Sequence, residues 1–471
     1  MIETLDHLRM PRKFCKDDLK KSFRNIQWSF RGKVLDMVGP IVESHLPGAQ
    51  LGTIVEIIVP RREDRIIAEV VGFKNSRVLL LPYGHLNGVS PSCDVLAISN
   101  LNEIPCGNFL LGKVLDPFMN DLTGLPLDVP DNAHLQPTDH KAPNPLARQR
   151  ISQPLSMGIR ALDGLLTFGE GQRIGIMAGS GVGKSVLMGM IARNSSADIN
   201  VIALIGERGR EVREFIEKDL GQEGLRRSVL VTVTSDQSPL MRIRGAKVAT
   251  AIAEHFSQQG KSVMLMVDSL TRIATAQREI GTARGETPTT EGYTPSVFSL
   301  LPRLLERSGP QPEGCGAISG LYTVLVDGDD FNGPIADAAR SILDGHINLS
   351  RDLAAKAHFP AIDISTSSSR VMNDIVSREH WLMANRIKEL IGVWNESLPL
   401  IQTGSYQPGS DPKIDLAIRL MPLIDTFLRQ EIEEFSNLES AITGLVRTLN
   451  GLPLTDEQAD GNGTPSHINA E

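Results

Sequence analysis

The sequence predicts an α/β protein with a mostly parallel central sheet, a small β-barrel before it and a helical region after it. Between residues ~156 and ~385, apolar segments of strand length alternate with helical segments, which is typical of such a sheet. Residues 28–97 contain short β-rich segments separated by Pro and Gly, which indicates a barrel. From residue 386 the strand pattern gives way to helical periodicity.

The composition is that of a globular protein with several domains. The chain has 471 residues, a net charge of -8, 41% hydrophobic and only 4% aromatic residues, so we expect a large and mainly aliphatic core. The acidic balance argues against nucleic-acid binding over much of the surface, and we expect no specific nucleic-acid partner. Four scattered cysteines without a C-x-x-C pair fit reduced thiols. Without a signal-peptide pattern or an apolar run of membrane-spanning length, we expect a cytoplasmic location.

The elements follow in order along the chain. Leu19, Phe23 and Ile26 recur at helical spacing within a basic arm, which fits either a partner-binding amphipathic helix or a solvated arm packed on its own domain. The candidate barrel strands are Gly32–Leu35, Gly52–Val59, Ile66–Val71 and Arg77–Leu81. Residues 98–155, rich in Pro and Asn, are interpreted as a linker that wraps into the next domain.

The α/β region has six candidate strands: Ile174–Met177, Val201–Ile205, Val229–Val233, Val263–Val267, Tyr322–Val326 and Ala361–Ser365. The candidate helices include Arg242–Gln258, Pro295–Arg307 and, near the C-terminus, Ile432–Leu449. We therefore divide the chain into an arm (1–27), a barrel (28–97), a linker with the α/β domain (98–385), a helical domain (386–454) and a disordered tail (455–471).

A glycine-rich segment between the first candidate strand and a helix matches a phosphate-binding P-loop. It consists of Ala178, Gly179, Ser180, Gly181, Val182, Gly183, Lys184 and Ser185. The backbone N–H groups of such a loop surround one anion. Lys184 would reach the β/γ-phosphates and the Ser185 hydroxyl would ligate Mg²⁺. Ala178 stands where the strict pattern has Gly. A flexible connector is the weaker interpretation because strand, helix and Gly-Lys-Ser ending are in register.

Two carboxylates follow strands that should end at the same edge of the sheet. Asp268 ends the apolar run 264–267 and can hold Mg²⁺, commonly through water. Glu207 follows the strand 201–205 and can polarise a water for in-line attack on a γ-phosphate. The alternatives are a turn Asp at a strand end and a Glu stabilised by a helix N-terminus.

Arg370 and Phe359 flank the last candidate strand. An arginine in a phosphate site stabilises transition-state charge. From position alone, however, a surface salt bridge is the favoured interpretation of Arg370, and Phe359 can equally be a core residue.

These motifs together resemble the catalytic subunits of rotary ATP synthases. The carriers are the P-loop, Gly206–Arg208, Val267–Asp268 and Pro360–Ser369, the last matching the signature P-x-x-D-x-x-x-S-x-S. Longer segments look like the export ATPases of type III secretion systems: Glu207–Ile216, Thr234–Arg242, Asp268–Ala274 and Asp327–Asp330. The segment 288–298 resembles the flagellar branch more than the virulence injectisome branch, and the resemblance covers residues ~30 to ~450.

The resemblance implies a β-barrel, a RecA-like nucleotide-binding domain and a helical C-terminal domain, assembled as a homohexameric ring with ATP between subunits. It also implies a role for each candidate residue: phosphate and Mg²⁺ contacts for Lys184 and Ser185, activation of water for Glu207, support of Mg²⁺ for Asp268, positions near the site for Arg208 and Arg272, a finger supplied to the neighbouring subunit for Arg370, and stacking on adenine for Phe359. Rotary synthases divide the catalytic Glu and the finger between two subunit types, whereas this chain carries both, so a ring of identical copies could complete every site.

The resemblance further implies a position at the inner face of the cell membrane and several partners: a stator-like regulator, a central stalk protein, the export gate and chaperone–substrate complexes. The leading function is an ATPase of flagellar export, and the injectisome ATPase is the nearest alternative. A RecA-fold hexameric helicase is more distant, since the barrel region offers only Trp28, Phe30, Phe73 and Tyr83 and no clear RNA-binding stripe. Glu207 argues against a non-catalytic scaffold.

Overall fold

The computed structural model describes residues 30–60, 65–98, 102–326, 328 and 330–454. The predicted arm and tail, and Asp327 and Asp329 of the acidic motif, lie outside the described residues. The chain divides into two compact units, with the boundary in the sequence between Asn102 and Glu103. Each unit is described by itself below.

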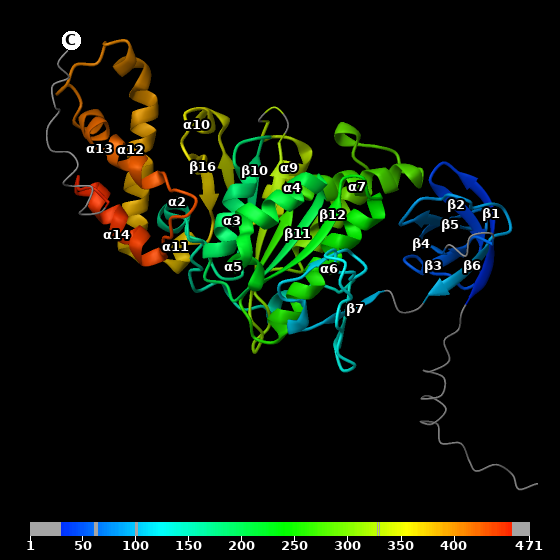
Figure 1. Ribbon diagram of the computed structural model, residues 1–471. Helices are drawn as coiled ribbons and strands as arrows, with labels where there is room; N and C mark the ends of the chain where they lie inside the picture. The colour runs from blue at the N-terminus through cyan, green and yellow to red at the C-terminus, as the bar shows by residue number, and fades with distance from the viewer. Residues whose placement is uncertain (1–29, 61–64, 99–101, 327, 329, 455–471) are drawn as a thin grey trace, which may run out of the picture. The chain divides into compact units, whose positions relative to one another are not determined.

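The first unit is a closed barrel of antiparallel strands (Figure 1). Its strands are β1 (Arg31–Val38), β2 (Ile41–His45), β3 (Ile54–Ile58), β4 (Arg65–Lys74), β5 (Arg77–Pro82) and β6 (Asp94–Ile98), in the order β1-β2-β5-β4-β3-β6. Buried valines such as Val42, Val55 and Val70 fill its interior. The four predicted strands are confirmed. The sequence did not predict β2 and β6, which are short and contain polar residues.

The second unit is built on an eight-stranded sheet in the order β16-β15-β10-β14-β13-β11-β12-β8. Its strands are β8 (Val114–Leu115), β10 (Arg173–Ala178), β11 (Ile199–Glu207), β12 (Ser228–Thr234), β13 (Val263–Asp268), β14 (Ile318–Leu325), β15 (Gly345–Leu349) and β16 (Ile362–Ser369). All neighbouring pairs are parallel except β15 with β16. The six predicted strands are confirmed. The segment interpreted as a linker contains β8 and a separate antiparallel pair, β7 (Glu103–Cys106) with β9 (His134–Pro137).

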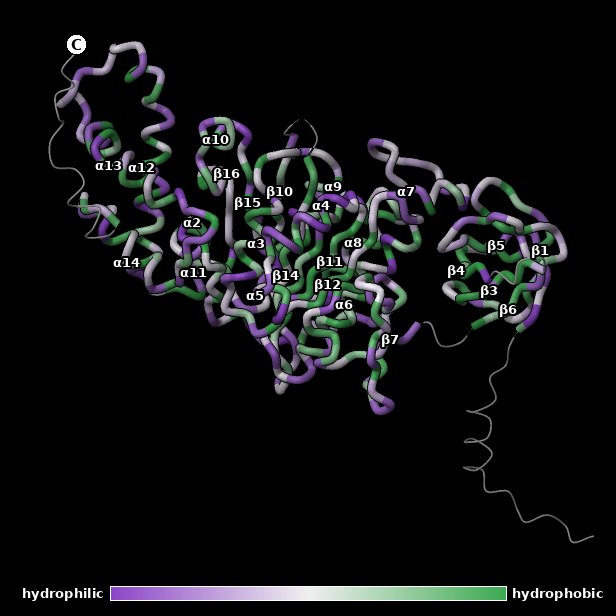
Figure 2. The backbone as a smooth tube through the Cα atoms, in the orientation of Figure 1, coloured by the Kyte–Doolittle hydropathy of each residue, from purple (hydrophilic) through white to green (hydrophobic). Residues whose placement is uncertain are grey.

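Helices connect and cover these strands, whose hydrophobic character is visible in Figure 2. They are α2 (Arg160–Leu165), α3 (Lys184–Asn194), α4 (Gly209–Glu214), the π-helix η3 (Phe215–Leu220), α5 (Gly221–Arg226), α6 (Pro239–Gln258), α7 (Leu270–Ala283), α8 (Pro295–Leu305), α9 (Pro334–Ile342), α10 (Arg351–Ala355) and α11 (Met372–Ile375), with short 3₁₀ turns at Asn108–Leu110, Pro145–Ala147 and Thr290–Gly292. The α6 and α8 helices confirm two predictions. None of the described helices is long and apolar enough to cross a membrane.

The C-terminal region is helical, as predicted, with α12 (Arg378–Gln402), α13 (Pro412–Leu428) and α14 (Leu438–Leu449). The predicted start of the last helix at Ile432 was wrong. Asn437 begins α14 with a capping box, because its Oδ1 accepts from the Ser440 N–H at 2.8 Å and Ser440 Oγ accepts from the Asn437 N–H at 2.9 Å. Residues 429–437 instead form a connection that lies against the α/β domain.

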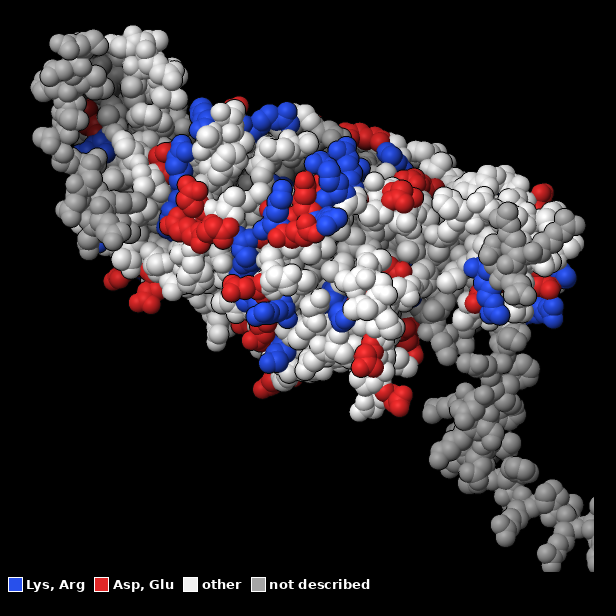
Figure 3. All heavy atoms as spheres, in the orientation of Figure 1, with Lys and Arg blue, Asp and Glu red and all other residues white. Residues whose placement is uncertain are grey.

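On the face of the second unit seen in Figure 3, acidic and basic side chains are interspersed over the region of α4. Several are paired along the chain, including Arg210 with Glu214 and Arg213 with Glu217. This mixed surface differs from the single-sign basic stripe that is typical of a nucleic-acid track.

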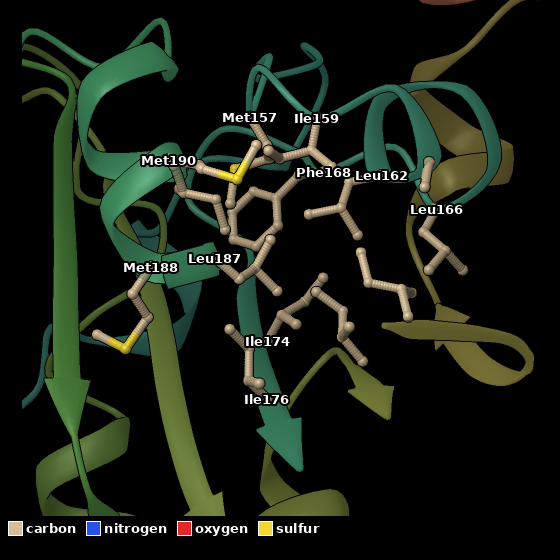
Figure 4. Close-up of a cluster of buried hydrophobic side chains, with 14 of the residues drawn as sticks. Met157, Ile159, Leu162, Leu166, Phe168, Ile174, Ile176, Leu187, Met188 and Met190 are labelled. Atoms are coloured by element: carbon tan, nitrogen blue, oxygen red, sulfur yellow. The ribbon is translucent and has the colours of Figure 1, made fainter. Parts of the chain in front are cut away.

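One hydrophobic cluster joins the α/β domain to the C-terminal helices. Figure 4 shows side chains of the α2 region, β10 and α3 converging in its centre, among them Phe168, Ile174 and Leu187. Phe427 on α13 lies beside Gly164 of α2 and Gly444 of α14, where a Cβ would approach the ring within 2.9 Å and 3.1 Å. As predicted, the cluster is mainly aliphatic, and its buried aromatic members are Phe168, Phe215 and Phe427.

Candidate active site

The predicted P-loop connects the end of β10 to the start of α3. Gly181 and Gly183 have φ angles of 79° and 90°, a region that favours glycine, and Gly183 is the residue before the helix. Ala178 is fully buried at the end of β10, so the small side chain at the non-glycine position is accommodated. Lys184 and the exposed Ser185 occupy the first turn of α3, where backbone N–H groups and the helix dipole favour an anion.

The structure brings Lys184 together with both predicted carboxylates. Asp268 ends β13 and Glu207 ends β11, and these parallel strands are neighbours in the sheet. Lys184 Nζ donates a hydrogen bond to Asp268 Oδ1 and lies 3.7 Å from Glu207 Oε1. Thr323 Oγ1, on β14, donates to the same Asp268 oxygen at 2.5 Å. No sequence motif pointed to Thr323, which belongs to none of the recognised patterns.

Glu207 occupies an environment that favours its neutral form. Burial and then the negative charge of Asp268 raise its pKa to about 7, against the opposing effect of Lys184. Its Oε1 atom is buried and accepts no hydrogen bond from the described residues. A carboxyl group with a pKa near neutrality and an uncommitted oxygen is suited to act as a general base.

A bulge at the end of β11 sets the direction of Glu207. The pairing of β11 with β12 shifts between Ile205 and Glu207, and Gly206 between them has φ 76°. The stem of Arg272, on α7, covers Gly206 so closely that a Cβ there would lie 2.9 Å from its Cβ and Cγ. The Arg272 stem therefore lies against the residue that precedes Glu207. Arg208 is largely exposed, and it is paired with Glu211 at 3.4 Å.

A cavity of about 310 Å³ adjoins the P-loop. Phe359, which is 46% exposed, borders it opposite Gly183, and a Cβ on Gly183 would lie 3.7 Å from the Phe359 ring. The other lining residues come from the P-loop and its helix, from the end of β15, from the approach to β16 and from the connection after α13: Val182, Val186, Leu187, Met190, Leu349, Ala357, Pro360, Ala361, Arg429, Gln430, Glu431 and Ile432. The sequence did not predict residues 429–432 as part of this site, and it assigned Ile432 to the start of the last helix.

Arg370 lies beyond the amino-terminal ends of the parallel strands, whereas the P-loop lies at their carboxyl-terminal ends. These two ends are the opposite edges of the sheet. Arg370 follows β16, which runs antiparallel to β15 and pairs Ser369 with Gly345 at the start of that strand. Its guanidinium donates to the carbonyl oxygens of Leu343 and Arg340 at 3.2 Å each. The nearby strand β10 has six residues, so a rise of about 3.3 Å per residue separates the two edges by about 17 Å. An arginine side chain is much shorter than this distance.

The side chains beside the P-loop include the oxygen ligands that Mg²⁺ prefers. Ser185 is exposed, and neither of the two hydrogen bonds that Asp268 accepts from described side chains involves its Oδ2. Among the described residues no group of three or more His, Cys, Asp or Glu side chains forms a metal cage. Nucleotide-bound Mg²⁺ is typically held through one or two protein oxygens, waters and substrate phosphates, and Ser185 and Asp268 would supply the protein oxygens. The residues present therefore fit a nucleotide-bound Mg²⁺.

A phosphate-binding loop at one end of a parallel sheet, with a lysine facing two carboxylates from neighbouring strands, defines this protein as a P-loop nucleoside triphosphatase. Family models extend this assignment. The nucleotide-binding domain of the ATP synthase alpha/beta family matches residues 158–369, its beta-barrel domain matches residues 34–98, and the T3SS EscN ATPase C-terminal domain matches residues 376–447.

Individual relatives are similar to this protein over most of its length. The chain is 50% identical to the flagellum-specific ATP synthase of Bacillus subtilis, over 88% of this chain and 94% of that protein. It is 45% identical to the type 3 secretion system ATPase of Sinorhizobium fredii, over 88% and 92%. The structure of the assembled ATPase EscN from enteropathogenic E. coli matches with a TM-score of 0.83 and 44% identity, over 89% of this chain and all of that one. The chain belongs to the family of flagellar and type III secretion ATPases and is an ATPase.

Proposed function

We propose that this protein hydrolyses Mg²⁺-ATP to energise type III protein export, most directly that of the bacterial flagellum, at sites completed between identical subunits. The observation that carries the proposal is the placement of Lys184, Glu207 and Asp268 at one edge of the sheet while Arg370 lies at the other. The similarity to flagellum-specific ATP synthases supports the export assignment.

The residues of the P-loop edge have distinct roles in this proposal. The backbone N–H groups of residues 179–183 and Lys184 bind the phosphates, and Ser185 and Asp268 hold the Mg²⁺. A bound Mg²⁺ neutralises charge on the β- and γ-phosphates. Lys184 exchanges Asp268 for phosphate oxygens when nucleotide binds, which removes a positive charge from the carboxylates. Glu207 then orients a water and accepts its proton.

The base of the nucleotide fits the cavity beside the P-loop. Phe359 offers an exposed ring for stacking, and Val182, Val186 and Ile432 supply apolar walls. Arg208 and Arg272, which flank Glu207, are proposed to act near the γ-phosphate. Because residues 429–432 belong to the C-terminal region, nucleotide binding would involve both parts of the second unit.

Arg370 is proposed to serve the P-loop of a neighbouring copy. The separation of about 17 Å between the edges argues against a contact with its own chain's phosphate, and the solved structure of EscN is described as assembled. An arginine supplied in this way accelerates phosphoryl transfer roughly 10³–10⁵-fold. The same relative has also been solved with its central stalk, and we propose a stalk partner here too.

Mixing two inactive variants tests this proposal. Glu207→Gln and Arg370→Ala should each lower ATP turnover roughly 10³-fold or more. If subunits are exchanged at equal amounts, about a quarter of interfaces join an intact Glu207 to an intact Arg370, so activity should recover to about a quarter of wild type. Recovery would be absent if both residues acted within one chain. Specific activity of the wild type should also rise with protein concentration.

The similarity to type 3 secretion system ATPases also supports the injectisome alternative. Deletion of the gene for this protein in its source cell distinguishes that alternative from flagellar export. Loss of motility with filament proteins retained in the cytoplasm, restored by the wild-type gene but not by Glu207→Gln, is the expected result. Normal motility with loss of secreted effector proteins would assign the protein to an injectisome instead.

A further inference from the structure

The Asp268 carboxylate is held by a side chain outside the recognised motifs. Val267 of β13 pairs with Tyr322 of β14, so the next residues along these parallel strands, Asp268 and Thr323, lie side by side. The Thr323 side chain is completely buried, and its hydroxyl donates to Asp268 Oδ1 at 2.5 Å. Lys184 donates to the same oxygen. Both hydrogen bonds to the carboxylate in the described part of the chain therefore fall on Oδ1.

We propose that Thr323 is a positioning residue that orients the Asp268 carboxylate so that Oδ2 faces the hydration shell of Mg²⁺. The inference rests on the function proposed above. When Lys184 leaves Asp268 for the phosphates, Thr323 becomes the remaining donor to Oδ1. Without that donor the carboxylate, which is 3% exposed, would be free to turn, and Oδ2 would no longer be held in one direction.

Burial is the reason that this hydroxyl requires an explanation. A hydroxyl removed from water without a partner costs free energy, whereas a valine of the same shape at this fully buried position would avoid that cost. Thr232 on β12 offers the contrast. It is also buried in the sheet, but its hydroxyl has no hydrogen-bond partner among the described residues. The Thr323 hydroxyl, by contrast, has the Asp268 carboxylate as its partner.

The test measures Mg²⁺ binding directly as well as turnover. Fluorescent mant-ADP is bound to the full-length protein in EDTA, and Mg²⁺ is then added in excess of the EDTA until the fluorescence change is complete. The Mg²⁺ midpoint is the concentration of free Mg²⁺ at which half of this change has occurred. Removing an outer partner of a metal ligand typically weakens metal affinity 10–100-fold, so Thr323→Val should raise the Mg²⁺ midpoint about tenfold. Affinity for mant-ADP in EDTA should be unchanged. Thr323→Ser, which keeps the hydroxyl, should restore the wild-type midpoint.

Thr232→Val is the matched control, since it removes a buried threonine hydroxyl from the same sheet without removing a hydrogen bond. Its Mg²⁺ midpoint should equal that of the wild type. An unchanged midpoint in Thr323→Val overturns the inference. So does an equal loss of mant-ADP affinity with and without Mg²⁺, which would assign Thr323 a purely structural role. A wild-type protein that binds mant-ADP without any response to Mg²⁺ would instead overturn the proposed function itself.

Discussion

At the scale of single residues, Glu207 has the most informative environment in the site. It shares a small buried volume with Asp268 and with one lysine, and the pKa of its carboxyl is raised to about 7 by burial and by the negative charge of Asp268. A general base works only when it is deprotonated, so its protonation should control turnover near neutral pH.

The pH dependence of kcat/KM should therefore show an acid limb near pH 7. Below that pH Glu207 is neutral and cannot accept a proton, and activity should rise as pH increases through about 7. Steady-state ATP hydrolysis between about pH 5 and 9 measures the limb. A limb near the ordinary glutamate value of 4.5 would contradict a raised pKa.

The same shift predicts a stability effect of Glu207→Gln. Since the folded-state pKa lies above the unfolded value, the unfolded state binds fewer protons between pH 4.5 and about 7, and Glu207 makes the wild type less stable as pH rises through that window. At pH 8 the glutamine variant should gain on the order of 1–3 kcal/mol of unfolding free energy. Thermal denaturation at pH 8 and at pH 5 measures the gain, which should shrink at the lower pH. Glu217 lies in an exposed ion pair with Arg213, so Glu217→Gln should neither gain unfolding free energy at pH 8 nor show a pH-dependent difference from the wild type.

Local sequence patterns were sufficient for the residues at the P-loop edge. Lys184 sits in a glycine motif, and Glu207 and Asp268 each end an apolar strand, so their shared position follows from parallel topology. Thr323 could not be found in this way. It lies in the middle of an ordinary buried strand, and its hydrogen bond depends on the register between β13 and β14, which is a tertiary property.

At the scale of elements, the bulge that ends β11 should link backbone conformation to turnover if Glu207 is the proposed general base. Gly206→Ala would place a Cβ at a φ of 76° and within 2.9 Å of the Arg272 stem. We expect a loss of about 1–3 kcal/mol in unfolding free energy. We also expect kcat to fall in the variant that remains folded, because Glu207 is the next residue. Chemical denaturation and steady-state turnover test the two effects.

Gly260→Ala is the control for that substitution. Gly260 has a similar φ of 79°, but no atom lies within 4 Å of the position that an added Cβ would take. It should lose only the cost of the left-handed backbone, about 1 kcal/mol, and keep full turnover. Equal kcat values for the two variants would show that the bulge does not aim Glu207.

Elements with strong periodicity were predicted well, and those defined by a few residues were not. The six long strands of the sheet are recognisable as apolar runs, whereas β8 has two residues and β15 mixes Gly, His and Asn into five. In the connection 429–437, residues 432–437 were predicted as the start of a helix, since Ile432 and Phe435 have the spacing of one helix face. Its conformation is set instead by the capping box of α14 and by Gln430, whose side chain donates to the Gly158 carbonyl at 2.9 Å.

At the scale of the whole molecule, one core connects the nucleotide site to the C-terminal helices. Phe427→Ala should lower the unfolding free energy of the second unit by about 3–5 kcal/mol, because the ring fills the space left by two glycines. The loss should appear as a single shifted transition for the α/β domain and the C-terminal helices in calorimetry, together with weaker nucleotide binding. Phe435→Ala, at a ring that is 64% exposed, should change stability by no more than about 0.5 kcal/mol.

Separate transitions for the α/β domain and the C-terminal helices would contradict a shared core. The broad architecture of barrel, α/β domain and helical region was predictable because each has its own hydrophobic period. The continuity of the core across the last two was not, since it depends on which faces of α2, α12, α13 and α14 meet.

If Arg370 serves the P-loop of a neighbouring copy as proposed, its placement opposite the P-loop gives every subunit a donor end and an acceptor end. Copies joined in this way form a head-to-tail series, which either grows as an open row or closes on itself. An open row leaves Arg370 without a partner site in the subunit at one end and the P-loop without an arginine in the subunit at the other end. Its number of complete sites is therefore one fewer than its number of subunits. Closure removes both loose ends at once, and the last subunit to arrive completes two sites rather than one.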